Sequence, residues 1–152
     1  MTRIVPITPD FAVAGALTPQ EMEAIAAAGF RTVINNRPDG EEFGQATAEA
    51  CGEAARRFGL LYYHLPAAGR DELMSEALVK ATLAAIAASP GPILAHCRSG
   101  YRSTVIWAAA AAQAGACSVA EVAARAAAAG VDVAPFAGEL ERLAALASQS
   151  QG

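Results

Sequence analysis

The stretch GPILAHCRSGYRST, residues 91–104, runs from an apolar segment through a polar cluster into a second apolar segment. Its Gly-Pro turn leads into ILAH, which is typical of a buried strand, and residues 103–114 are almost wholly apolar, which predicts a buried helix. Residues 97–102 form the loop between them. Strand, loop and helix in this order predict one βα unit of a parallel sheet.

The same alternation continues along the chain. Short apolar runs predict further strands at residues 11–15, 30–35 and 60–65. Capping residues, glycines and prolines bound helical patterns at about residues 19–29, 46–58, 76–88, 118–129 and 134–148. We therefore expect an α/β fold with a mainly parallel central sheet flanked by helices, in which ligands bind at the carboxyl ends of the strands.

Length and composition limit the classes of function. The chain has 152 residues without a repeat or linker, so residues 1–148 should form one domain and residues 149–152 a frayed tail. Hydrophobic residues make up 54% and charged residues 17%, and the net charge is −4. This charge argues against nucleic acid or an anionic membrane surface as the main partner.

Three cysteines and two histidines show no metal-ligand spacing, and nothing else in the pattern requires a metal or cofactor. Cys51 and Cys117 have no basic neighbours, so we interpret both as core residues. The odd cysteine count, and the lack of a leader or a long apolar span, predict a cytoplasmic protein.

Cys97 is the candidate nucleophile. If residues 97–102 wrap over the start of the following helix, its free amides, its dipole and two guanidiniums would surround one sulfur or one bound anion and keep Cys97 as a thiolate. Gly100 suits a positive φ, and Arg102 offers a planar fork to an oxyanion. The candidate anion-binding residues beside Cys97 and Arg102 are Arg98, Ser99, Gly100, Tyr101 and Ser103.

Three neighbouring residues have supporting interpretations. His96 either supports the loop through a hydrogen bond or simply fills the end of its strand. Ser103 could donate its hydroxyl to the sulfur when the sulfur leaves. His64 is interpreted as structural.

Two motifs together carry a family likeness, HCRSGYRS at residues 96–103 and VINNRPDGEE at residues 33–42. They resemble the bacterial phosphatase-like domain of beta-lactamase-hydrolase-like proteins, the DUF442 family, and the likeness covers residues 4–135. It implies a fold similar to dual-specificity protein phosphatases, with the cysteine loop as active site. The family is linked to phosphatase-like chemistry and to sulfur transfer alongside persulfide dioxygenases, so a persulfide dioxygenase is a possible partner.

The loop spacing separates these two activities. Cysteine phosphatases place five residues between Cys and Arg, whereas four separate Cys97 from Arg102 here, and position 103 is Ser. The missing residue shortens the loop by up to about 3.3–3.6 Å and narrows the anion cradle. Cys-Arg-Ser-Gly-x-Arg is instead similar to the loop of single-domain rhodaneses, which hold a cysteine persulfide; this second likeness is confined to the loop.

The general acid gives a second test. Phosphatases of this fold carry an Asp on a loop before the cysteine, and the corresponding place here is Gly69. Asp71, two residues further on, is either a substitute acid or a turn residue near the start of a helix. Transfer of sulfur from thiosulfate needs no acid, because sulfite leaves as an anion.

The acids of the other motif stay open to two interpretations. Asp39, Glu41 and Glu42 are alternative acids or anchors for Arg37. Arg37 itself either forms a structural salt bridge or meets a substrate anion.

We therefore predict a sulfurtransferase in which the Cys97 thiolate attacks the outer sulfur of thiosulfate or glutathione persulfide and becomes a persulfide. The alternative is a phosphatase with a Cys97 phosphoenzyme and Asp71 as acid. A third hypothesis is a module that senses persulfides or oxidants through its thiol without turnover. In the first two cases the substrate is a small sulfur-containing or phosphate-type anion.

Overall fold

The computed structural model describes residues 2–151. Within them the strands form a five-stranded sheet with the order β1-β2-β5-β3-β4. The strands are β1 (Ile4–Thr8), β2 (Phe11–Ala14), β3 (Thr32–Asn35), β4 (Leu61–His64) and β5 (Ile93–His96). The four strands β2 to β5 are parallel, and β1 pairs antiparallel with β2. The predicted α/β fold with a mainly parallel sheet is confirmed.

Strand β1 is the element that sequence patterning missed. It carries Pro6 and lies at the edge of the sheet, with a register shift between Pro6 and Thr8. Proline lacks an N–H and is tolerated in a sheet only at an edge or a bulge. A segment with a proline at its centre therefore gave no strand signal, although the edge position accommodates it.

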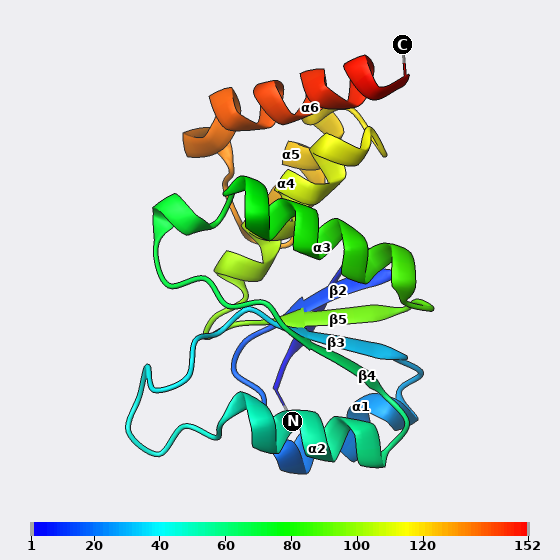
Figure 1. The fold of residues 1–152 in the computed structure, drawn as a ribbon, viewed down its shortest axis with the longest axis vertical. Helices are drawn as coiled ribbons and strands as arrows, with labels where there is room; N and C mark the ends of the chain where they lie inside the picture. The colour runs from blue at the N-terminus through cyan, green and yellow to red at the C-terminus, as the bar shows by residue number, and fades with distance from the viewer. Residues whose placement is uncertain (1, 152) are drawn as a thin grey trace.

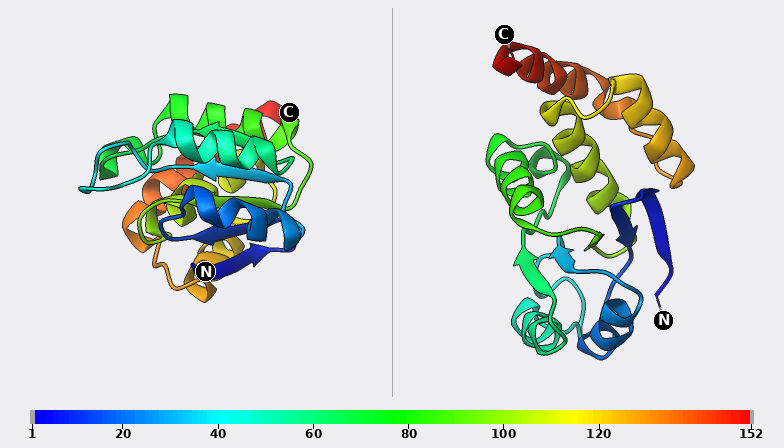
Figure 2. Two further views of the ribbon diagram at one scale, coloured as in Figure 1. Left: turned by 90° about the horizontal axis from the view of Figure 1, so that it is seen from below. Right: turned by 90° about the vertical axis from the view of Figure 1, so that its right-hand side faces the viewer.

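Helices cover both faces of the sheet (Figures 1 and 2). One face carries α1 (Met22–Ala27) and α2 (Ala48–Arg57). The other carries α3 (Glu76–Ala88), α4 (Tyr101–Ala114), α5 (Val119–Ala128) and α6 (Ala137–Gln151). No helix among the described residues combines the length and apolar character that a membrane span needs.

The beginning of α4 and the end of α6 differ from the predictions. Helix α4 begins at Tyr101 and not at residue 103, because Gly100 has a φ of 93° and turns the chain directly into the helix. Helix α6 continues to Gln151, so residues 149–151 are helical where a frayed tail was expected, and Gly152 lies outside the described residues. The short turns η1 (Pro19–Glu21) and η3 (Ala134–Phe136) form the first part of the helices predicted at 19–29 and 134–148.

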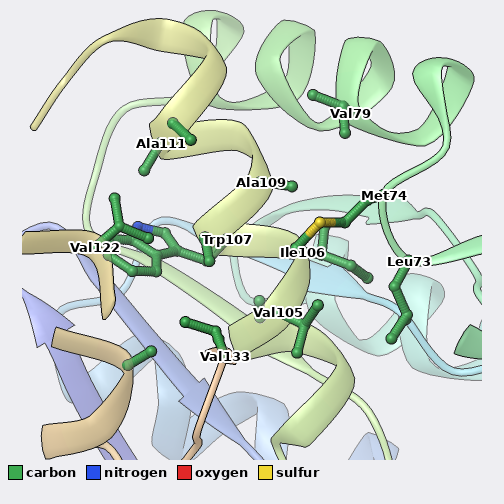
Figure 3. Packing of buried hydrophobic residues seen from close by; sticks show 14 of the residues in the cluster. Leu73, Met74, Val79, Val105, Ile106, Trp107, Ala109, Ala111, Val122 and Val133 are labelled. Carbon is green, nitrogen blue, oxygen red and sulfur yellow. The ribbon is translucent and has the colours of Figure 1, made fainter. Parts of the chain in front are cut away.

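The core lies in two clusters because side chains alternate along each strand. Along β5, Ile93 and Ala95 pack on the side of α3 to α6, and Leu94 packs on the side of α1 and α2. Figure 3 shows Ile106 beside Met74, and Trp107 beside Val122. All residues of α4 from Ser103 to Ala112 are buried, as predicted, so the beginning of this helix is held rigidly at the carboxyl edge of the sheet.

Candidate active site

Three loops leave the carboxyl edge of the sheet side by side. The parallel strands β2, β5, β3 and β4 end at neighbouring residues, which pair with one another across the sheet: Ala14, His96, Asn35 and His64. Directly after it come Cys97, Asn36 and Leu65, and the Asn36 amide still donates to the His96 carbonyl at 2.8 Å. The loop from β3 to α2 and the loop from β4 to α3 both leave this edge (Figure 1). Both family motifs therefore meet at the predicted place.

Cys97 is fully buried at the start of α4. Its Sγ accepts a hydrogen bond from the Gly100 amide at 3.1 Å. The amides of Arg102 and Ser103, in the first turn of α4, donate to no acceptor within residues 2–151. Unpaired first-turn amides are the usual donors to a bound anion, and here they accompany a cysteine sulfur.

Arg102 is held by three hydrogen bonds. Its Nη1 and Nη2 donate to the two carboxylate oxygens of Glu41 at 2.7 and 2.8 Å, and Nη1 also donates to the Ala67 carbonyl at 2.7 Å. The Glu41 hydrogen bonds raise the pKa of Arg102 despite its partial burial, and the charge of Glu41 and the nearby Cys97 sulfur add to this. Arg102 is therefore a charged side chain whose position is fixed by Glu41 and Ala67.

Arg98 is placed differently. Its guanidinium is 65% exposed and pairs with Glu42 at 2.8 Å. The expectation that two guanidiniums surround the sulfur therefore has support for Arg102 but not for Arg98. Ser99 accepts a hydrogen bond from the Tyr101 amide through Oγ at 3.3 Å, and the Tyr101 side chain is exposed.

Arg37 is buried and anchored. Its amide donates to Asn35 Oδ1 at 2.8 Å, and its carbonyl lies 2.9 Å from the ring Nε2 of His64, which gives His64 the structural position expected. Its Nε donates to Glu41 at 3.0 Å. Its Nη2 lies 3.4 Å from Glu42, close enough for an ion pair but without the geometry of a hydrogen bond. In this structure Glu41 and Glu42 anchor Arg37.

Asp39 serves the loop and the following helix. Its Oδ1 accepts a hydrogen bond from the Ala48 amide at 2.8 Å, at the start of α2. The Thr47 hydroxyl accepts from the Ala50 amide at 3.1 Å. These contacts satisfy first-turn amides of α2, which is a structural role.

His96 is buried beneath the loop as a neutral ring. Burial lowers its pKa to about 4, and the nearby Cys97 backbone opposes this only in part. Neither ring nitrogen has a hydrogen-bond partner in the described part of the chain. The imidazole is therefore uncharged at neutral pH and adds no positive charge to the site.

Ser103 points to Asn36 and not to the sulfur. Its hydroxyl donates to Asn36 Oδ1 at 2.9 Å, and Asn36 Nδ2 donates to the Leu65 carbonyl at 2.9 Å. Asn35 Nδ2 donates in turn to the Tyr62 hydroxyl at 2.9 Å. The sequence analysis assigned no role to Asn35 or Asn36. Two polar residues at the end of a buried strand could have indicated a hydrogen-bonded position at the site.

Asp71 lies on the short helix η2 (Arg70–Glu72). It is exposed and forms no hydrogen bond or ion pair within residues 2–151. Its neighbours fix the segment elsewhere: Arg70 donates to Pro135 at 2.9 Å and stacks over Phe136 at 4.5 Å. The contact of this loop with Arg102 comes from Ala67.

The other two thiols lie outside the cysteine loop. Cys51 is buried in α2 and Cys117 is half-buried, and burial raises the pKa of both. Raised pKa values disfavour the reactive thiolate. Across the described residues, no three His, Cys, Asp or Glu side chains are grouped as metal ligands would be.

Comparison with known proteins identifies the family. Residues 3–116 match the family described as the phosphatase-like domain of beta-lactamase hydrolase-like proteins. The chain belongs to this family. Beta-lactamase hydrolase-like proteins from Xylella fastidiosa strain 9a5c and Agrobacterium fabrum are 41% and 34% identical to it over 70% and 62% of its length. It spans only 24% and 22% of those proteins.

Solved structures share the fold. A candidate phosphatase from Neisseria meningitidis is 30% identical with a TM-score of 0.77, covering 92% of this chain and 97% of its own. A DUF442 candidate phosphatase from Shewanella putrefaciens is 20% identical with a TM-score of 0.65, over 98% and 90% of the two chains. Human DUSP28 is 19% identical with a TM-score of 0.65, over 98% and 95%. The fold is that of cysteine phosphatases of the dual-specificity type. The family description and the likeness to the Neisseria protein support the phosphatase alternative better than the sulfurtransferase that the loop spacing predicts.

Proposed function

We propose that this domain is a Cys97-dependent transferase that moves sulfur from a small anionic donor, thiosulfate or glutathione persulfide. The observation that carries the proposal concerns Glu41, the carboxylate that pairs with Arg102. Both of its oxygens accept hydrogen bonds from arginine side chains. Hydrogen bonds from Arg102 and Arg37 lower the pKa of Glu41, so it is ionised at neutral pH and cannot donate a proton. The shortened loop between Cys97 and Arg102 adds to this argument.

The two reactions differ in their need for a proton. In sulfur transfer the Cys97 thiolate attacks the outer sulfur of thiosulfate, the S–S bond of the donor breaks, and sulfite leaves with the electron pair. Cysteine persulfide forms, and no proton moves. In phosphate-ester cleavage the departing alkoxide must be protonated, a step worth about 10²–10⁴ in rate.

The surroundings of Cys97 fit a small anion. Gly100 already donates an amide hydrogen to the sulfur, and the free amides of Arg102 and Ser103 would bind the donor's oxygens together with the Arg102 guanidinium. Because Cys97 is fully buried, neighbouring side chains must shift to admit a donor.

Phosphate hydrolysis is the second candidate, and the fold and family favour it. Cys97 would form a phosphoenzyme, and Asp71 would act as the acid after a movement of the loop that carries it. The Asp71 side chain is exposed and has no hydrogen bond or ion pair within residues 2–151, so no contact of its own would have to break during this movement.

Two further proposals follow from sulfur transfer. A nucleophilic free thiol is preserved in a reducing compartment, so we propose that the protein is cytoplasmic. Transfer of the persulfide sulfur to glutathione would produce glutathione persulfide, which makes a persulfide dioxygenase a fitting partner.

The deciding experiment measures covalent intermediates. The protein is incubated with thiosulfate or with an aryl phosphate, and its intact mass and the released product are recorded. We expect one added sulfur atom on the wild type and on Asp71→Asn, and none on Cys97→Ser. Aryl phosphate turnover that requires both Cys97 and Asp71, without a sulfur adduct, would contradict sulfur transfer and support the phosphatase. If neither reaction occurs although Cys97 reacts with alkylating agents, both enzyme proposals fail.

A further inference from the structure

Glu41 uses one side of the Arg102 guanidinium and leaves another free. Its two oxygens bind Nη1 and Nη2, and the Ala67 carbonyl takes the second hydrogen of Nη1. A guanidinium has five N–H groups, of which Nε–H and the second Nη2–H lie along a separate edge. No oxygen of the described residues accepts from that edge. After Glu41, the nearby Cys97 sulfur also raises the pKa of Arg102.

Glu41 is itself fixed from two directions. Arg37, whose side chain is 7% exposed, donates to Oε1 of Glu41 through Nε at 3.0 Å. Gln45 accepts a hydrogen bond from the Glu41 amide at 3.1 Å and donates to the Pro38 carbonyl at 2.9 Å. The carboxylate therefore has a defined place before any substrate arrives.

We propose that Glu41 is a positioning residue, which orients Arg102 so that its Nε edge faces Cys97 and receives the anionic group of the substrate. The inference rests on the proposed anion transfer at Cys97, but it is the same for sulfonate and for phosphoryl oxygens. Glu41 acts through Arg102 and does not touch the substrate. A two-point contact is needed for this role, because a single hydrogen bond would let the guanidinium rotate.

A purely electrostatic role would have the opposite effect. If Glu41 only offset the positive charge of Arg102, its removal would strengthen the attraction of anions to the site. If it positions Arg102, its removal misaligns the donors and weakens their action on an anion beside Cys97. The sign of the change therefore separates the two roles.

The test compares two alkylating agents of similar size, iodoacetate and iodoacetamide, which differ in the charge of one group. The ratio of their rate constants for Cys97, located by peptide mass, measures how well the site guides an anion to the sulfur. The variants are Glu41→Gln, which loses the charge, and Glu41→Asp, which keeps it but is one methylene shorter. Glu21→Gln is the matched control, because Glu21 also accepts hydrogen bonds that lower its pKa, from Thr2 and Thr18.

We expect the iodoacetate-to-iodoacetamide ratio to fall about tenfold in Glu41→Gln and about threefold or more in Glu41→Asp, and to be unchanged in Glu21→Gln. In an Arg102→Lys background, Glu41→Gln should cause no further fall. An unchanged or higher ratio in Glu41→Gln overturns the proposal. So does a wild-type ratio in Glu41→Asp, because charge alone would then be sufficient. If Glu41→Gln does not fold, Glu41→Asp decides.

Single-turnover transfer separates this inference from the proposed function. Where sulfur transfer occurs, its rate should fall by about a hundredfold in Glu41→Gln. If the wild type transfers neither sulfur nor phosphate but the alkylation ratio falls in both Glu41 variants, the positioning role stands and the proposed function fails. If transfer occurs and the ratio does not change, the positioning role fails and the function stands.

Discussion

The Ser103 hydroxyl donates to Asn36 Oδ1 at 2.9 Å, and both side chains are buried. This bond joins the first turn of α4 to the end of β3, which precedes the loop that carries Glu41. Because Asn36 also binds the Leu65 carbonyl, one amide side chain ties together all three loops at the carboxyl edge.

Removal of this bond should destabilise the fold. Ser103→Ala leaves a buried acceptor on Asn36 without its donor, so the free energy of unfolding should fall by about 1–3 kcal/mol in urea titrations. Ser99→Ala, in the loop just before α4 and exposed, should change it by less than about 0.5 kcal/mol. Equal losses in the two variants would show that the Ser103 to Asn36 bond contributes nothing specific.

Stability should depend on pH through His96. Its pKa in the folded protein is about 4, below its ordinary value of 6.5, so between these values the unfolded chain takes up a proton that the folded chain does not. The free energy of unfolding should therefore fall as pH falls from about 6.5 to 4, by up to about 3 kcal/mol. Unfolding titrations of His96→Phe should lack this part of the pH dependence, whereas His64→Gln should retain it. Parallel pH profiles for wild type and His96→Phe would refute the buried neutral state.

Replacement of Gly100 should slow persulfide formation by more than its effect on stability explains. At a φ of 93°, alanine is strained by about 1–2 kcal/mol, and relief of that strain would move the amide that binds Cys97 Sγ. Gly59→Ala, at a φ of 82° after α2, should cost similar stability without slowing persulfide formation. Persulfide formation measured by mass spectrometry should slow only in Gly100→Ala, and equal slowing in both would assign the effect to stability.

The two loop arginines should contribute unequally. Arg102→Lys loses the fork that meets Glu41 and the substrate, so the rate of transfer should fall about a hundredfold or more. Arg98→Lys keeps the positive charge of an exposed side chain that pairs with Glu42, so the rate should fall about threefold or less. Single-turnover rates at fixed thiosulfate check both, and similar losses would mean that Arg98 moves to the anion during the reaction.

The sequence by itself determined the architecture and pointed to the candidate nucleophile. The pattern of apolar residues predicted the strands at 30–35, 60–65 and 93–96 and the buried helix after residue 103. Such a pattern is visible in the sequence because a buried strand or helix must carry apolar side chains wherever its backbone directs them into the core. The loop motif singled out Cys97 and Arg102 as candidates, because few roles other than anion chemistry bring a cysteine, a glycine and two arginines to the start of a helix.

Only the tertiary structure decided which charged groups pair. The contact of Glu41 with Arg102 joins residues 61 positions apart, and it exists because β3 and β5 are neighbours in the sheet although β4 separates them in the chain. Side-chain direction also depends on the tertiary structure. Arg98 and Arg102 look alike in the motif, yet the Arg98 guanidinium is exposed whereas that of Arg102 is largely buried against Glu41. Pairing of charges depends on distances that a chain acquires only when its strands are assembled.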